Sequence, residues 1–209
     1  DSRAYLVRKG EMVQLTQDHN YHTVLVEKAN AGLLDEEEFA KEDVRGEALI
    51  SFLGIFFRNS LNKGEDIISL AAERTQVTSY LEIQQIRYSD ILRYEINVPQ
   101  ALMDCMVPKL ILQPLVENAL YHGIKNRRGM GLITVTGEEK EGQLLLKVTD
   151  NGAGMDEEQV RILQAGIYED RHTGLGLVNV HKRIRLYCGE PYGLFFESQM
   201  GKGSVVSIR

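Results

Sequence analysis

The sequence lacks the features that mark several classes of protein. Its two cysteines, Cys105 and Cys188, are far apart and show no metal-ligand spacing, which argues against a disulfide framework and favours a reducing compartment. No apolar run approaches the ~20 residues that a membrane-spanning helix needs. Repeats and low-complexity tracts are also absent from the sequence. These absences indicate a globular chain without membrane contact of its own.

The charge of the chain argues against a nucleic-acid partner. The formal net charge is −6, whereas phosphate backbones need clustered Lys and Arg, and one small basic cluster exists at Lys125, Arg127 and Arg128. The 209 residues suffice for one large domain, or for one domain with an appendage. Because the chain does not begin with methionine, we expect a piece of a longer protein, with any membrane anchor outside it.

Apolar periodicity predicts the order of the secondary-structure elements. The N-terminal part is expected to form a hairpin, followed by helices over 20–44, 47–61 and 66–90. A strand over 92–98 is expected next, then a helix over 107–125 and strands over 132–139 and 143–150. Helices over 155–166 and 174–189 and a terminal hairpin over 193–209 complete the chain. Strands outnumber the crossovers of a parallel fold, so we predict an α+β fold with helices on one face of a mixed sheet.

Polar side chains interrupt the otherwise apolar helix "LQPLVENALYHGIK", residues 112–125. Glu117, Asn118 and His122 fall within a few residues, and Asn118 and His122 share a helical face because they are four residues apart. Asparagine offers a neutral oxygen ligand for a hard cation such as Mg²⁺. A solvent-facing polar stripe is the alternative interpretation, since such groups must be solvated, capped or bound.

The stretch "DNGAGM", residues 150–155, follows a buried-looking strand. A carboxylate at the floor of a pocket accepts a hydrogen bond from an amino group, which suits the exocyclic amine of adenine. Gly152 and Gly154 let the backbone approach a flat ring without side-chain collision. An ordinary turn is the alternative for this stretch.

A third segment, "HTGLGLVNV", places Gly174 and Gly176 at the start of a helix. The free N–H groups of a helix N-terminus bind anions. The polar loop 167–173 before it is a candidate lid over a nucleotide. The alternative is a plain connector.

Taken in this order, the three segments resemble the N, G1 and G2 boxes of the GHKL (Bergerat-fold) ATP-binding superfamily. With the upstream phrases "EDIISLAAERTQVTSYLEIQQIRYSD" and "PKLILQPLVENALYHGIK", the chain is similar to LytS-type sensor histidine kinases from about Phe56 to Arg209. The resemblance implies a two-layer α/β sandwich, preceded by a helical segment and the small N-terminal hairpin.

The resemblance also implies roles for single residues. Asn118 would coordinate Mg²⁺ between the ATP phosphates, Glu117 would act as the N-box acid, and Asp150 would bind the adenine amine. The glycines of the G1 box would shape the ring pocket, and the G2 box would cradle the phosphates. The other implied cofactor-binding residues are His122, Lys125, Gly152, Gly154, Gly174, Leu175 and Gly176.

By the same resemblance, the ATP γ-phosphoryl passes to a histidine and then to an aspartate of a response regulator, mainly through positioning and charge stabilisation. The expected partners are ATP, a response regulator and the acceptor-helix domain of the parent kinase. The parent is expected to be a homodimer anchored in the membrane, with this part in the cytoplasm. The family's acceptor phrase N-P-H-F is absent, and none of the histidines is assigned as acceptor: His19, His22, His122, His172 and His181.

Residues 1–54 resemble an interior piece of PPM-family Ser/Thr phosphatases, through "DSRAYL" and "QLTQDH". The other metal-binding aspartates of that family have no counterpart, so phosphatase activity is not implied. A natural fusion, a displaced gene segment and an engineered junction all remain open as origins. We therefore predict an appendage over 1–54, linker helices near the dimerisation region over 55–91, and the catalytic domain over 92–209. For helix 66–90, core packing is favoured over a dimer seam.

Two further functional interpretations stay open. The missing acceptor histidine is consistent with a noncatalytic nucleotide-binding or partner-docking module of the GHKL type. A GHKL kinase that acts on serine in a partner, as anti-sigma factors do, is the other alternative, and the 66–90 segment disfavours it.

Overall fold

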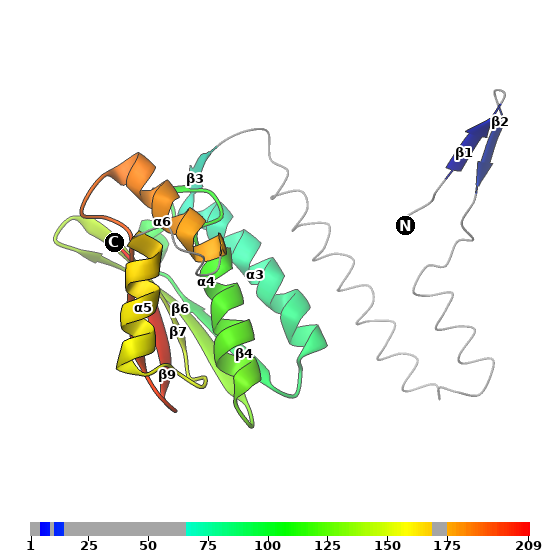
Figure 1. Cartoon of the computed structure of the whole chain (residues 1–209). Coiled ribbons are helices and arrows are strands. Elements are labelled where there is room, and N and C mark those ends of the chain that lie inside the picture. Colours follow the sequence, from blue (N-terminus) through cyan, green and yellow to red (C-terminus); the bar gives the residue numbers. More distant parts are fainter. Residues whose placement is uncertain (1–4, 9–10, 15–65, 169–174) are drawn as a thin grey trace. The chain divides into compact units, whose positions relative to one another are not determined.

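The computed structural model describes residues 5–8, 11–14, 66–168 and 175–209. The chain separates into two compact units, Asp1–Leu53 and Gly54–Arg209. In the first unit, β1 (Tyr5–Arg8) and β2 (Glu11–Gln14) form the predicted antiparallel hairpin, with Tyr5 opposite Gln14 (Figure 1). The helices predicted over 20–44 and 47–61 lie outside the described residues, as do Gly174 and most of the predicted lid.

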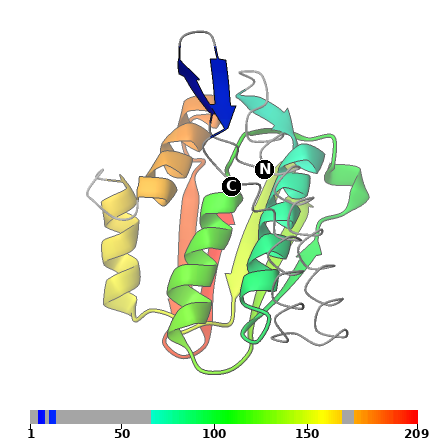
Figure 2. The ribbon, with the colours of Figure 1, turned by 90° about the vertical axis from the view of Figure 1, so that its right-hand side faces the viewer.

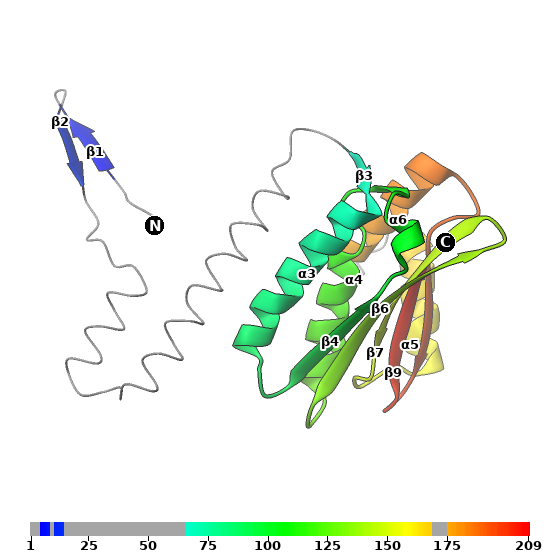
Figure 3. The ribbon, with the colours of Figure 1, turned by 180° about the vertical axis from the view of Figure 1, so that it is seen from behind.

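A mixed five-stranded sheet forms one layer of the second unit (Figure 3). Its strand order is β4-β6-β7-β9-β8, and β4 is parallel to β6 while the other neighbours are antiparallel. The strands are β4 (Leu92–Asn97), β6 (Gly131–Lys140), β7 (Gln143–Asp150), β8 (Leu194–Gln199) and β9 (Gly203–Ile208). The prediction of a mixed sheet is confirmed.

Helices cover one face of this sheet and form the second layer (Figure 2). They are α3 (Leu70–Arg87), α4 (Gln113–Asn118), α5 (Glu157–Tyr168) and α6 (Leu175–Cys188). α4 continues into the π-turn η2 (Ala119–Gly123) and the 3₁₀ turn η3 (Ile124–Asn126), and a further 3₁₀ turn, η1 (Gln100–Leu102), follows β4.

The core lies between the two layers. Side chains alternate between the faces of a strand, and β6 and β7 bury every second residue along most of their length. Fully buried side chains come from both layers, including Leu92, Ile133 and Leu146 of the sheet and Leu81, Leu115 and Leu120 of the helices. The predicted two-layer α/β sandwich is therefore confirmed.

The predicted helix over 107–125 is wrong in its first part. Met106–Pro108 is a short strand, β5, which pairs antiparallel with β3 (Ile67–Ser69). Pro108 disfavours helical geometry in the residue before it, and Leu110 has a φ of 60°, which a right-handed helix excludes. The helix begins only at Gln113, with Pro114 in its first turn, where proline is tolerated.

α3 is an integral part of this unit. Its first turn is capped by Ser69, whose Oγ accepts from the Ala72 N–H at 3.2 Å. The N–H of Leu70 donates to the Cys105 carbonyl at 2.8 Å. The apolar positions Leu70, Val77 and Leu81 are buried in the core. The apolar stripe of α3 therefore packs inside the unit.

Candidate functional site

An open cavity of about 480 Å³ lies between the helical layer and the end of β7. It gathers segments that are distant in the sequence: the α4–η2 helix, the turn after β7, α5, α6 and the β8–β9 turn. Its lining residues are Asn118, His122, Gly123, Asn126, Asp150, Ala153, Gly154, Met155, Gln159, Leu163, Leu177, Met200 and Ser204. The cavity thus brings together residues of all three motifs singled out in the sequence, with Leu177 as the residue of the third.

Asp150 is the last residue of β7, where it is held between Ile133 of β6 and Ser204 of β9. It is only 5% exposed, and its Oδ1 accepts from the Gly152 N–H at 2.8 Å. Burial raises the pKa of this carboxyl, and the backbone N–H groups of Gly152 and Ser204 oppose that shift. A desolvated carboxylate at a cavity wall is a strong acceptor for any donor that enters.

Glycines bring the turn after β7 into contact with the end of the α4–η2 helix. A Cβ on Gly152 would lie 2.3 Å from the carbonyl carbon of Gly123, and a Cβ on Gly123 would lie 2.5 Å from Asp150 Oδ1. The Ala153 N–H donates to the Gly123 carbonyl at 3.1 Å. Gly152 is therefore a packing residue behind the cavity wall rather than part of its lining, and Gly123, which the sequence analysis missed, is its counterpart.

Gly154 does line the cavity. Its φ is +66°, and a Cβ there would lie 2.0 Å from the Gln199 carbonyl oxygen in the β8–β9 hairpin. This position needs glycine for its backbone conformation and for its close contact.

The helix that carries "VENALYH" presents different side chains to different neighbours. Asn118 and His122 line the cavity. Glu117 does not, because its Oε1 accepts from Gln113 Nε2 at 2.8 Å along the same helix. Lys125 also lies elsewhere: its Nζ is 4.8 Å from the centre of the Tyr121 ring and 5.1 Å from that of Tyr88, a cation–π arrangement. The structure thus separates Glu117 and Lys125 from the cavity that Asn118 and His122 share.

The π-turn η2 lies between Asn118 and the 3₁₀ turn η3. Turns of this kind are rare and are often found at functional sites. Asn126 extends the lining by one more turn, and its Nδ2 donates to the His122 carbonyl at 2.9 Å. The four-residue spacing from Asn118 to His122 continues to Asn126, which was a signal available in the sequence.

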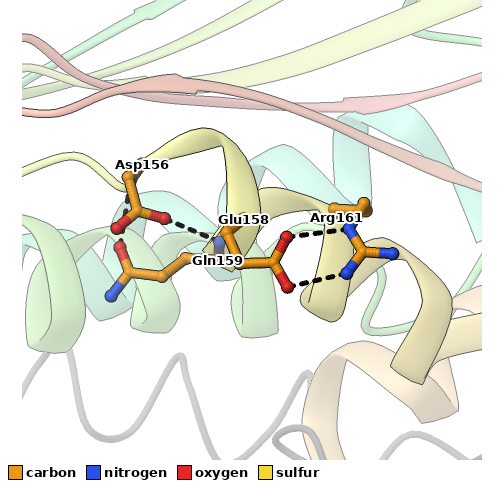
Figure 4. Close-up of polar contacts among 4 residues, drawn as sticks. All are labelled: Asp156, Glu158, Gln159 and Arg161. Carbon is orange, nitrogen blue, oxygen red and sulfur yellow. Dashed lines mark hydrogen bonds and ion pairs between the residues drawn. The ribbon is translucent and has the colours of Figure 1, made fainter.

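α5 forms a wall of the cavity, and its start is fixed by a reciprocal pair of hydrogen bonds (Figure 4). The Gln159 N–H donates to Asp156 Oδ1 at 2.8 Å, and the Asp156 N–H donates to Gln159 Oε1 at 3.0 Å. This is a capping box. Beside it, Arg161 contacts Glu158 with two nitrogens, at 2.9 and 2.7 Å. The box orients Gln159 at the wall, with Leu163 one turn further along α5.

The third motif lies at the start of α6, where Leu177 lines the cavity. Gly176 is exposed in the first turn of that helix, and a Cβ there would meet nothing closer than Pro114 Cβ at 3.5 Å. The side chain of Leu175 and all of Gly174 lie outside the described part of the structure.

Comparison with known proteins shows which family this chain resembles. Residues 106–209 match the family model for histidine kinase-, DNA gyrase B- and HSP90-like ATPases, and residues 35–92 match the histidine kinase model. The sensor histidine kinase YesM of Bacillus subtilis is 34% identical over 160 residues, which is 77% of this chain and 26% of the relative. The chain belongs to the histidine kinase family. Its ATP-binding catalytic domain contains the cavity described above.

Other histidine kinases agree with this assignment. The sensor protein LytS of Staphylococcus haemolyticus is 32% identical over 152 residues, 72% of this chain and 26% of the relative. The catalytic domain of histidine kinase ThkA has the same fold, with a TM-score of 0.52 at 21% identity, covering 68% of this chain and 92% of that one. The histidine kinase domain of the Erythrobacter litoralis blue-light activated kinase gives 0.51 at 16% identity, covering 90% and 81%.

The matches define how much of the relatives this chain covers and where kinase-related sequence begins. This chain spans about a quarter of the length of the curated relatives (26% for YesM). The histidine kinase model begins at residue 35, so kinase-related sequence starts earlier than Phe56, where the sequence resemblance had placed it. Within the described residues, no helix is both long enough and apolar enough to span a bilayer.

Proposed function

We propose that this ATP-binding domain holds ATP with Mg²⁺ in the cavity and transfers the γ-phosphoryl group to a histidine. The observation that carries the proposal is the placement of a buried carboxylate, Asp150, in the same cavity as Asn118 and His122. The cavity thus offers an acceptor for an amine at Asp150 and further polar side chains at Asn118 and His122.

The adenine ring would bind at the Asp150 end. The carboxylate would accept from the exocyclic amine, while Met155, Leu163 and Leu177 supply apolar wall around the ring. Gly154 lines the same cavity with backbone alone, because a Cβ there would collide with the Gln199 carbonyl oxygen of the β8–β9 hairpin. A guanine would present a carbonyl to the same carboxylate, so the site favours adenine.

The triphosphate would run toward Asn118, His122 and Asn126. Within the described residues, no group of three or more His, Cys, Asp or Glu side chains is placed to hold a metal ion by itself. Asn118 fits Mg²⁺ because this ion commonly uses few protein ligands together with phosphate oxygens and water. The start of α6, with Gly176 in its first turn, would add backbone N–H groups near the phosphates.

The domain would then act by holding the nucleotide and screening its charge, with little covalent chemistry of its own. Glu117 is engaged with Gln113 and lies outside the cavity lining, so its predicted role as a base would require it to leave that contact. Lys125 would likewise have to leave the aromatic rings of Tyr88 and Tyr121 to reach a phosphate.

The remaining partners belong to the whole kinase, of which this chain covers a part. We infer that the acceptor histidine is supplied by an acceptor-helix domain of the parent protein, which passes the phosphoryl group to a response regulator. By the same reasoning, the parent is a homodimer anchored in the membrane, with this domain in the cytoplasm. The PPM-like character of residues 1–54 remains an inference from its sequence phrases alone.

A second candidate function is a nucleotide-binding module that transfers no phosphoryl group. The observation that favours it is that Glu117 contacts Gln113 and does not line the cavity. Calorimetric titration with a non-hydrolysable ATP analogue, with and without Mg²⁺, tests the binding step that both functions share. Incubation with γ-labelled ATP and a separate acceptor-helix peptide distinguishes them. Label on histidine supports the kinase, whereas Mg²⁺-dependent binding without transfer supports the module. An absence of binding would contradict both.

A further inference from the structure

The interface between α3 and the α4–η2 helix contains buried polar side chains. Glu73 and Gln76 of α3 are each only 1% exposed, although such residues are rarely so buried in proteins. Glu73, Gln76 and Tyr80 are three and four residues apart, so they share one face of α3. We call these three residues the polar seam, because each of them meets a group in the segment 110–121.

Glu73 holds the entrance of the α4 helix. Its Oε2 accepts from the Leu110 N–H at 2.9 Å and its Oε1 accepts from the Leu112 N–H at 2.8 Å. Leu112 is the N-cap residue of α4 and supplies no side-chain cap of its own. The carboxylate of a different helix therefore satisfies the backbone N–H of the α4 N-cap residue and that of the residue two positions before it.

The same loop is also held from α6. Arg183 donates from Nη1 to the Lys109 carbonyl, so charged side chains of α3 and α6 fasten neighbouring residues of one loop. Leu110, between them, keeps a φ of 60° that is unfavourable for a leucine. These contacts account for the persistence of that conformation.

The seam continues along α4. Gln76 Nε2 donates to Gln113 Oε1 at 3.2 Å, and Gln113 Nε2 donates to Glu117 Oε1 at 2.8 Å. One turn further along α3, burial raises the pKa of the Tyr80 hydroxyl, and the neighbouring side chains of Glu117 and Tyr121 add to that shift. Each contact is directional, so the set is satisfied at one rotation and one axial position of α4 relative to α3. Apolar packing alone would tolerate a slip more easily.

A neighbouring face of this helical segment borders the cavity. Asn118 directly follows Glu117, and His122 directly follows Tyr121, yet Asn118 and His122 line the nucleotide site. A rotation or slip of α4 at the seam would therefore move these two side chains relative to Asp150, which is fixed in the sheet.

We propose that the polar seam, with Glu73 as its main member, is a positioning device that sets the affinity of the site for the phosphate end of the nucleotide. The inference rests on the proposed function, since it names what places Asn118 and His122 for ATP. It assigns α3 a direct influence on the nucleotide site, so that a displacement of α3 changes ATP binding without a contact between α3 and ATP.

The test compares Glu73→Gln with Glu82→Gln by calorimetric titration of adenosine and of a non-hydrolysable Mg²⁺–ATP analogue. Glutamine keeps the size of Glu73 but presents an amide N–H₂ to one of the two backbone donors. Glu82 is the matched control, because it lies on the same helix and contacts Tyr94 Oη at 3.2 Å. A second variant, Gln113→Met, removes the α4 partner of Gln76 and replaces it with a side chain of similar volume.

We expect Glu73→Gln and Gln113→Met to weaken binding of the Mg²⁺–ATP analogue by about tenfold or more, with adenosine affinity changed less than twofold and Glu82→Gln like the wild type. A general loss of structure would lower both affinities together. If the wild type binds the analogue and either Glu73→Gln or Gln113→Met keeps the wild-type ratio of the two affinities, or lowers both in parallel, the inference is overturned while the proposed function stands. Failure of the wild type to bind overturns both.

Discussion

Replacing Asp150 with asparagine separates nucleotide binding from fold stability. The carboxylate is 5% exposed, lines the cavity and already accepts one hydrogen bond, from the Gly152 N–H at 2.8 Å. An asparagine fits the same volume and still accepts that bond through its oxygen. It then presents its N–H₂ group to the incoming adenine amine, so an acceptor is exchanged for a donor.

The expected loss of affinity follows from the kind of bond that is removed. A hydrogen bond to a charged group is worth about 1.5–3 kcal/mol, and each 1.4 kcal/mol corresponds to about a tenfold change in affinity. We therefore expect Asp150→Asn to weaken binding of an ATP analogue by at least about tenfold at pH 7. Calorimetry at constant Mg²⁺ measures this directly.

The stability of Asp150→Asn should not fall with its affinity for the nucleotide. Burial raises the folded-state pKa of Asp150 above its ordinary value, so the stability linked to this group is present below pH ~3.9 and is lost as the pH rises through the folded pKa. At pH 7 the ionised side chain costs the free domain stability, and asparagine removes that cost. The urea midpoint of Asp150→Asn should equal or exceed that of the wild type.

The exposed residue Asp104 supplies the control, because Asp104→Asn makes the same chemical change at the surface. It should alter neither affinity nor stability. Unchanged affinity in Asp150→Asn would refute the adenine contact. A loss of affinity together with a lower urea midpoint would show that the variant damages the fold instead.

Three further predictions concern other residues. Asn118→Ala should abolish the Mg²⁺ dependence of analogue binding while sparing adenosine; titrations that keep the full dependence would exclude this ligand role. Gly152→Ala should destabilise the fold by about 1–3 kcal/mol in urea, because its Cβ would lie 2.3 Å from the Gly123 backbone. Gly176→Ala, whose Cβ would have room, should not destabilise it; equal effects would contradict this packing account. Burial and Arg185 lower the pKa of His181, so its contribution to stability is present above pH ~6.5 and is lost as the pH falls through the folded pKa. Wild-type urea midpoints should therefore fall as the pH is lowered from ~6.5 to ~5, and His181→Gln should flatten that fall; an unchanged slope would count against this account.

The strands were readable from the sequence because their patterns are local. Alternation in "QLLLKVTD" predicted a strand over 143–150, and β7 is Gln143–Asp150. The mixed sheet followed from counting strands against crossovers. By contrast, the apolar run before Gln113 was taken for helix, because β5 exists only through its pairing with β3, and such a pairing leaves no periodic trace in three residues.

Some residues of the candidate site were predictable from local sequence, and others were not. Asp150 and Asn118 were identifiable from residue type and spacing, and both line the cavity. Glu117 lies one residue from Asn118 yet contacts Gln113, four residues earlier on the same helix, so the two side chains lie on different helical faces. Which of these faces borders the cavity is set by the tertiary fold. Gly123 and Glu73 gave no signal of their own, because each acts through a contact with a residue far along the chain.

The central claim is that one cavity grips adenine at Asp150 and the phosphates near Asn118. A crystal structure of the domain with Mg²⁺ and a non-hydrolysable ATP analogue tests it most directly. The account predicts the exocyclic amine within hydrogen-bond distance of the Asp150 carboxylate and Mg²⁺ between Asn118 Oδ1 and the phosphate oxygens. A nucleotide bound elsewhere, or bound in this cavity with the adenine amine away from Asp150, would contradict it.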